Sequence, residues 1–229
     1  MKRTFFLLSL LGPAAGSLPG AVIGIAFHNG ATTVNAMTTR PDGAVVATTT
    51  DTWNNPARNG AGGLGLSFTG FALNDTTGTA TGASLGATSG FTTFNSNGWG
   101  SQSQDHVMME GWYGFSGSEA LSIDNLPAEF TDNGYTVTIF GDIAAARTMN
   151  YTIGGTTQTI VDDGTTFNGT FSVENSTTFS GLNAASFTIT GNATGGRSGI
   201  NGIVIEAVPE PSTGLLSVLA AGLLFRRRR

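Results

Sequence analysis

The sequence predicts an all-β protein whose strands form a jelly-roll-like β-sandwich. Gly, Thr, Ser and Asn dominate its 229 residues and only 11% of the chain is charged, a composition that favours strands and turns over helices. Short β-prone runs recur at intervals of roughly ten to twenty residues between Gly and Asn turns, which favours a sandwich over a propeller. No repeat of fixed period stands out.

The predicted strands follow in chain order. The run VIGIAF, 22–27, is the first. Residues 134–142, GYTVTIFGD, alternate with a period of two, and both faces contain apolar side chains, so a central strand is expected. Within 148–161, two β-prone runs flank Gly154 and Gly155, whose access to positive φ suits a two-residue hairpin turn. Further strands are predicted within 63–71, 120–126, 166–174, 185–191 and 202–208.

Charge is distributed unevenly along the chain. Residues 22–210 contain four arginines and all fifteen acidic residues, a balance of −11, while the other six basic residues stand at the two ends. Nucleic-acid backbones are bound by basic surfaces, so this body is not expected to bind nucleic acid. Cysteine is absent, which excludes disulfides, thiolate metal sites and cysteine nucleophiles.

The N-terminal residues 1–21 have the three parts of a secretory signal peptide. Lys2 and Arg3 precede an apolar run, and the small residues of GPAAGSLPGA follow it. A buried N-terminal helix is the alternative, but five Gly and Pro residues would break it. We therefore expect export and cleavage between Gly16 and Ala21.

The C-terminal residues 208–229 combine a short motif, an apolar segment and a basic end. As a helix, residues 212–225 would span about 21 Å, less than the roughly 30 Å of a hydrocarbon layer. We expect a transient transmembrane helix with its basic end in the cytoplasm; an ordinary permanent anchor is the alternative. The motif is Val208, Pro209, Glu210 and Pro211, and the cytoplasmic stop is Arg226, Arg227, Arg228 and Arg229.

This tail, about 22 residues long, resembles a PEP-CTERM sorting signal, the C-terminal tag of exported proteins in many Gram-negative bacteria. The resemblance implies an exosortase as processing partner, a transient stay at the inner membrane, and delivery to the outer surface or extracellular matrix. It also implies a link to exopolysaccharide and biofilm. One departure is a slightly short apolar segment, which puts the efficiency of processing in question.

The body, 22–207, is also similar to the β-sandwich ectodomains common among PEP-CTERM proteins, over loosely spaced motifs. A structural or adhesive role in the matrix is therefore the leading hypothesis. A carbohydrate-binding jelly-roll module is the alternative, and a secreted glycan-active hydrolase is a third hypothesis. Asp105, His106 and Glu110 stand together, and a serine could complete a triad with the Asp and the His. We expect no enzyme activity, because neighbours in sequence rarely have the orientations of a triad and no nucleophile elbow is present. Glu110 with Glu174 would be a carboxylate pair for a hydrolase only at a suitable separation.

Two kinds of binding residue are nevertheless present in the sequence. Asp162, Asp163 and Asp132 offer oxygen ligands for a structural calcium ion, although Asp before Gly is also an ordinary turn former. Aromatic faces could stack on the sugar rings of matrix glycans, or else pack in the core. The stacking candidates are Trp99, Trp112 and Tyr113.

Overall fold

The computed structural model describes residues 21–27, 52–56, 68–88, 92–95, 109, 111–143, 146–165 and 172–209. All of these except Pro209 belong to one compact unit, Gly20–Val208. Its regular structure is almost entirely antiparallel strand, so the predicted all-β class and sandwich are confirmed. The predicted signal peptide and most of the predicted sorting segment lie outside the described residues. Within the ranges given above, no helix is long and apolar enough to cross a membrane.

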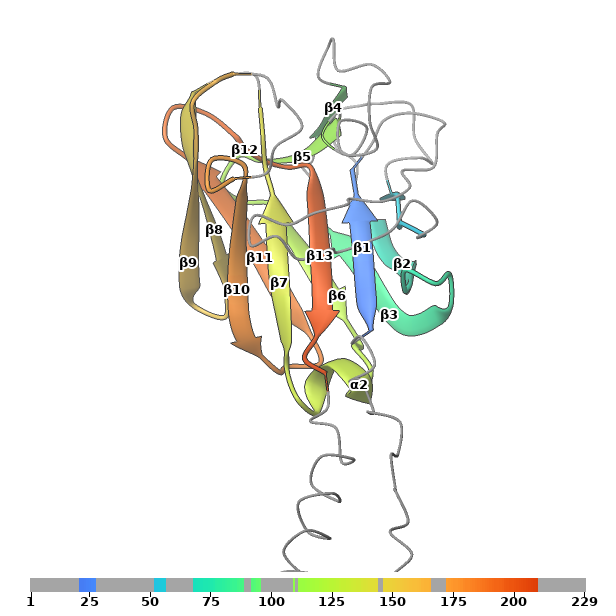
Figure 1. Ribbon diagram of the computed structural model, residues 1–229. Helices are drawn as coiled ribbons and strands as arrows, with labels where there is room; N and C mark the ends of the chain where they lie inside the picture. Colours follow the sequence, from blue (N-terminus) through green and yellow to red (C-terminus); the bar gives the residue numbers. More distant parts are fainter. Residues whose placement is uncertain are drawn as a thin grey trace, which may run out of the picture. The chain divides into compact units, whose positions relative to one another are not determined.

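Two antiparallel sheets face each other across the core, and a small third sheet lies at one end (Figure 1). The four-stranded sheet has the order β1 (Val22–Ala26), β13 (Gly202–Ala207), β7 (Tyr135–Phe140) and β10 (Ser176–Leu182). The six-stranded sheet has the order β2 (Phe68–Asn74), β3 (Ala80–Ala87), β6 (Ala120–Asp124), β11 (Phe187–Ala193), β8 (Arg147–Ile153) and β9 (Thr156–Asp162). The third sheet has the order β12 (Ser198–Ile200), β5 (Gly111–Phe115) and β4 (Thr92–Asn95).

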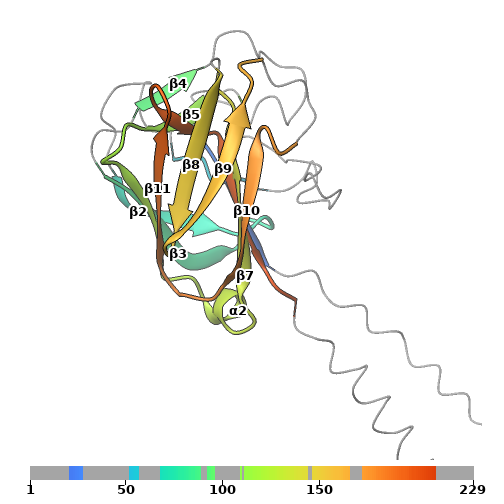
Figure 2. The ribbon, with the colours of Figure 1, turned by 90° about the vertical axis from the view of Figure 1, so that its left-hand side faces the viewer.

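The chain passes repeatedly from one large sheet to the other. From β6 it crosses through the short helix α2 (Ala128–Thr131) to β7, and then back to the β8–β9 hairpin. From there β10 joins the four-stranded sheet, β11 the six-stranded sheet and β13 the four-stranded sheet again. Figure 2 shows β8, β9 and β11 side by side, with β7 and β10 in the other sheet (Figure 2).

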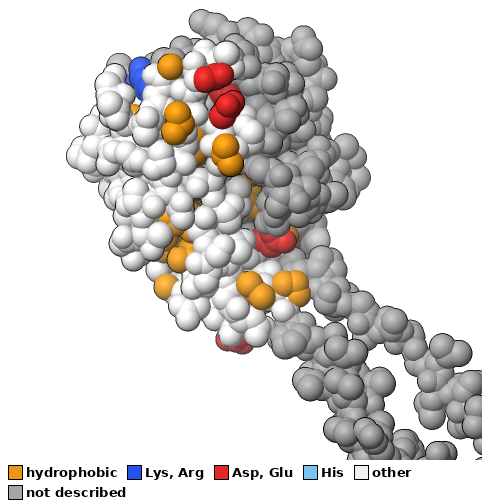
Figure 3. Space-filling model, turned by 60° about the vertical axis from the view of Figure 1, so that its left-hand side comes forward, with side chains coloured by type: hydrophobic (Ala, Val, Ile, Leu, Met, Phe, Trp, Pro, Cys, Tyr) orange, Lys and Arg blue, Asp and Glu red, His pale blue; other side chains and the backbone are white. Residues whose placement is uncertain are grey.

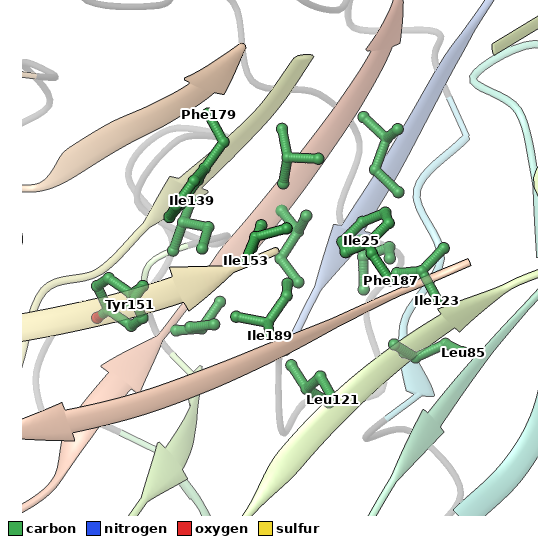
Figure 4. Close-up of a cluster of buried hydrophobic side chains, with 14 of the residues drawn as sticks. Ile25, Leu85, Leu121, Ile123, Ile139, Tyr151, Ile153, Phe179, Phe187 and Ile189 are labelled. Atoms are coloured by element: carbon green, nitrogen blue, oxygen red, sulfur yellow. The ribbon is translucent and has the colours of Figure 1, made fainter. Parts of the chain in front are cut away.

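Alternation along the strands builds the core between the sheets. In β8, Met149, Tyr151 and Ile153 are buried, while Asn150 and Thr152 between them are partly exposed. Successive strand residues point to opposite faces, so one face of each strand supplies the core. Side chains of both sheets meet there, such as Ile25 and Ile139 of the four-stranded sheet and Leu121 and Ile189 of the six-stranded one (Figure 4).

The two most detailed local predictions are confirmed. β7 lies between β13 and β10, as expected of a strand with apolar residues on both faces. The β8–β9 hairpin turns at Gly154 and Gly155, whose φ angles are 56° and 82°. Positive φ at both central residues defines the turn type whose twist matches that of paired strands.

The C-terminal end of one predicted strand is wrong, and several strands of the described residues were not foreseen. Residues 173 and 174 of the predicted strand 166–174 lie in a turn with Asn175, closed by a 2.8 Å hydrogen bond from the Ser172 amide to Asn175 Oδ1. The strand, β10, begins only after this turn, and 166–171 lie outside the described residues. β3 was missed because it is rich in Gly and Ala, which are depleted in strands, and β5 because two glycines interrupt its pattern. Each of them nevertheless pairs with a strand on both sides.

Candidate functional site

The outer surface of strands β11, β8 and β9 carries an array of uncharged polar side chains, which we call the threonine–asparagine face. The inward positions of these strands hold the core, and the positions between them point away from it. None of its members is charged, and five of the seven are exposed. The face consists of Thr188, Thr190 and Asn192 on β11, Asn150 and Thr152 on β8, and Thr157 and Thr159 on β9.

Strand register arranges these side chains in rows that run across the strands. Hydrogen bonds link neighbours within each row: the hydroxyls of Thr152 and Thr157 are 2.8 Å apart, and Thr159 Oγ1 donates to Asn150 Oδ1 at 2.8 Å. Asn150 Nδ2 in turn donates to Asn192 Oδ1 at 3.2 Å. The rows are Thr190, Thr152 and Thr157, and then Asn192, Asn150 and Thr159.

This arrangement presents hydroxyls and amides at regular spacings, about 4.8 Å across strands and about 6.7 Å along them. The hydrogen-bonded members orient one another, and each hydroxyl or amide retains unused donor or acceptor positions. In Figure 3, most of the described surface on view is neither charged nor hydrophobic (Figure 3). Such a surface can form many weak hydrogen bonds to an uncharged hydroxylated polymer and needs no pocket to do so.

A second polar group lies at the end of the sandwich where β7 and β9 end. Asp142 follows β7 and Asp162 ends β9; they are 6% and 5% exposed. Asp162 Oδ2 accepts the Ile143 amide at 2.8 Å, and Asp162 Oδ1 accepts the Gly164 amide at 2.7 Å. The neighbouring Asp163 is exposed and accepts the amide of Thr165 at 2.7 Å.

The electrostatics of this group are those of crowded, desolvated carboxylates. Burial, followed by the charges of Asp162 and Asp163, raises the pKa of Asp142 to about 8. Burial also raises the pKa of Asp162, against the two amide hydrogen bonds and the charge of Arg147. The Arg147 guanidinium donates to the Arg197 carbonyl at 2.8 Å, so it is oriented by the backbone.

The predicted calcium ligands are therefore only partly brought together. Asp132 caps the C-terminus of α2, before β7 begins, whereas Asp162 and Asp163 lie near the end of β7, at the opposite end of the sandwich (Figure 1). The acidic residue that does lie near Asp162 and Asp163 is Asp142. The sequence did not indicate this, because Asp142 and Asp162 are twenty residues apart in the chain. Among the described residues, no three His, Cys, Asp or Glu side chains are grouped closely enough to hold a metal ion.

Of the predicted stacking residues, Tyr113 is a correction. It is fully buried, with its ring centroid 5.4 Å from that of Phe27 and 4.8 Å from that of Phe115, so no sugar can reach its face. Trp112, on the other side of β5, is half-buried and remains a candidate. Its ring lies over Gly114 and Gly199, where an added Cβ would come within 2.5 Å and 3.0 Å of it.

Other predicted functional residues fall elsewhere. Trp99, Glu110 and the arginine cluster lie outside the described residues, as do both histidines. Of the predicted sorting motif, only Val208 and Pro209 are described. Both are exposed, directly after β13, and the Val208 amide donates to the Gly134 carbonyl at 2.9 Å.

Comparison with known proteins adds little to this description. No protein-family model and no curated protein matches the chain. Among solved structures, the chain is similar to Bacteroides uniformis beta-glucuronidase 2 covalently bound to cyclophellitol-6-carboxylate aziridine, with 13% identity and a TM-score of 0.45. The similarity covers 82% of this chain and 18% of that protein, so the chain spans less than a fifth of its length.

Proposed function

We propose that the protein is an exported, exosortase-processed component of the surface or extracellular matrix of a Gram-negative bacterium, where it binds exopolysaccharide in a structural or adhesive role. The threonine–asparagine face is the observation that carries the adhesive part. The sorting part rests on residues 1–21 and 208–229, with their signal-like organisation. The exposure of Val208 and Pro209 supports it, because a protease needs access to its motif.

We also assign the sandwich to the jelly-roll type. The order β1-β13-β7-β10 facing β6-β11-β8-β9 supports this assignment, because successive strands cross between the sheets as two nested Greek keys require. β2 and β3 then extend the second sheet beyond β6. Jelly rolls occur in lectins and in many other proteins, so the fold alone does not identify a ligand.

The chemistry of the face favours a neutral polysaccharide as its partner. A charged polymer would need complementary charges, and the face has none. Each hydrogen bond exchanged with water contributes little, on the order of 1 kcal/mol. Avidity must therefore come from repeated contacts along a polymer or from many copies of the protein in the matrix.

We expect the purified full chain to sediment with microcrystalline cellulose, used as a neutral probe, and to bind equally well in 0.5 M NaCl. The double variant Thr190→Lys with Asn192→Lys should lower binding about 10-fold, because it would place one charge in each of the two rows of the face. The matched control is Ser180→Lys with Asn183→Lys, which adds the same charge at exposed positions outside the face. Equal binding by the two double variants would refute a role for the face.

Half-buried Trp112 favours a discrete carbohydrate-binding module as the second candidate function, because stacking on one aromatic residue gives a defined sugar site. In the same sedimentation assay, Trp112→Ala should then abolish binding while Thr190→Lys with Asn192→Lys leaves it unchanged. The opposite pattern supports the extended face. The two candidates therefore differ in which variant loses binding.

Processing is tested separately, in a Gram-negative host that has an exosortase. Mass spectrometry of the surface-located protein should find an N-terminus between Gly16 and Ala21 and a C-terminus near Pro209, without the arginine cluster. A variant with Glu210→Ala and Pro211→Ala should retain the cluster, whereas the neighbouring Thr213→Ala should be processed normally. A surface-located wild type that still ends in four arginines would contradict the exosortase proposal and leave the adhesive proposal standing.

A further inference from the structure

We propose that Asp142 and Asp162 together bind a divalent cation, Ca²⁺ by preference, at the end of the sandwich where β7 and β9 end. The two carboxylates come from different sheets. They are joined through the backbone, because Asp162 Oδ2 accepts the amide of Ile143, the residue after Asp142. A cation there would link the end of one sheet to the end of the other.

The first observation is an oxygen without a partner. Asp142 Oδ1 is buried, and no group in the described part of the chain donates a hydrogen bond to it. Buried Asn201 lies beside it but has other partners: its Oδ1 accepts the Asp142 amide at 2.7 Å, and its Nδ2 donates to the carbonyls of Met109 and Gly111. A buried carboxylate oxygen without a donor is costly unless a cation or a proton compensates it.

Glu119 shows how this fold satisfies a buried carboxylate without a cation. It is 3% exposed, and the Ser116 hydroxyl, the Ser116 amide and the Ser118 amide all donate to it. Burial alone would raise the pKa of Glu119, but these hydrogen bonds outweigh it and lower the pKa. Asp142 Oδ1 has no such donor among the described residues, so hydrogen bonds do not stabilise a negative charge on it as they do on Glu119.

The second observation is the excess of negative charge around that oxygen. The negative charges of Asp162 and Asp163 disfavour ionisation of Asp142 and so raise its pKa. A divalent cation at the same place would favour the ionised form instead. The positive charge of Arg147 lowers the pKa of Asp162, but less than the other influences on that carboxyl change it. Its guanidinium donates to a backbone carbonyl.

The donor atoms select the kind of cation. Asp142 and Asp162 offer only oxygen, which suits Ca²⁺ or Mg²⁺ rather than a metal that prefers nitrogen or sulfur. Ca²⁺ tolerates irregular coordination better than Mg²⁺, which demands near-ideal octahedral geometry. Two protein carboxylates leave other coordination positions to water and backbone oxygens. We therefore expect weak binding, with a Kd on the order of 1 mM, in the range of extracellular modules.

Thermal unfolding of the purified full chain tests the site. Relative to EDTA, 10 mM Ca²⁺ should raise the folding equilibrium constant about 11-fold if the Kd is about 1 mM, which corresponds to a Tm increase of roughly 3 to 6 °C. Mg²⁺ at the same concentration should give a smaller shift. No Tm shift with either ion would overturn the proposal and leave Asp142 as a buried neutral acid.

Isosteric variants locate the effect. Asp142→Asn should abolish the Ca²⁺-dependent shift while leaving the Tm in EDTA equal to that of the wild type or higher, because it removes an uncompensated carboxylate. Asp162→Asn should also abolish it, and Asp132→Asn, at the other end of the sandwich, should retain it in full. If Asp162→Asn fails to fold, Asp142→Asn still decides. A full Ca²⁺ shift in Asp142→Asn would exclude this site.

Discussion

Tyr151→Ala is expected to lower the free energy of unfolding by about 4 to 5 kcal/mol, near the upper end for truncation of a buried aromatic residue. Tyr151 is fully buried and lies among core residues of both sheets (Figure 4). Its ring packs edge-on against Phe115, with centroids 6.5 Å apart. Its hydroxyl donates to the Gly199 carbonyl at 2.5 Å, which joins β8 to β12. Alanine would leave a large cavity and remove this connection.

Urea unfolding of the purified full chain, followed by tryptophan fluorescence, measures the effect. Tyr151→Phe serves as the control, because it keeps the ring and removes only the hydroxyl, at an expected cost of about 1 to 2 kcal/mol. The difference between the two variants isolates the contribution of packing. A loss below about 2 kcal/mol for Tyr151→Ala would mean that the core tolerates this cavity and that Tyr151 is not central to it.

Gly141→Ala is expected to cost about 3 kcal/mol, a large effect for one added methyl group. The new Cβ would lie 2.7 Å from the Gly199 carbonyl oxygen and 2.7 Å from the Tyr151 hydroxyl. A backbone carbonyl within a sheet cannot move aside as a flexible side chain can. Gly181→Ala is the comparison, since nothing lies within 4 Å of its Cβ position and only its φ of 73° opposes the change, at a cost of about 1 kcal/mol.

A double-mutant cycle examines the cause of this loss. In the Tyr151→Phe background one of the two close oxygens is absent, so Gly141→Ala should cost measurably less than it does in the wild type. The same urea titrations supply all four free energies. Strict additivity would show that the Tyr151 hydroxyl is not the obstacle and that the backbone contact alone limits this position.

The parts of the fold that could be predicted from sequence are those specified locally. The Gly154-Gly155 hairpin depends on its turn residues, and the alternation in 134–142 indicates a strand whatever surrounds it. β3 and β5 could not be predicted this way, because glycines interrupt their patterns and partner strands specify them. In β5, Trp112 and Tyr113 are adjacent aromatics, and the sequence does not say which one faces the core.

The candidate sites differ in the same respect. A low-charge surface rich in Thr and Asn follows from composition, but the rows of the threonine–asparagine face depend on the register of β11, β8 and β9. Asp162 and Asp163 were visible as adjacent acids in a turn. Asp142 joins them only because β7 and β9 end at the same end of the sandwich, which is a property of the topology.

The position of β13 in its sheet determines how the protein would bear mechanical load. β13 is the last strand before the proposed sorting segment, and it pairs along its length with β1 on one side and β7 on the other. A pull on its C-terminal end acts parallel to the strand, so both ladders of hydrogen bonds are loaded in shear together and cannot be unzipped one bond at a time. β13 is thus held against a pull on its C-terminal end by two ladders of hydrogen bonds at once.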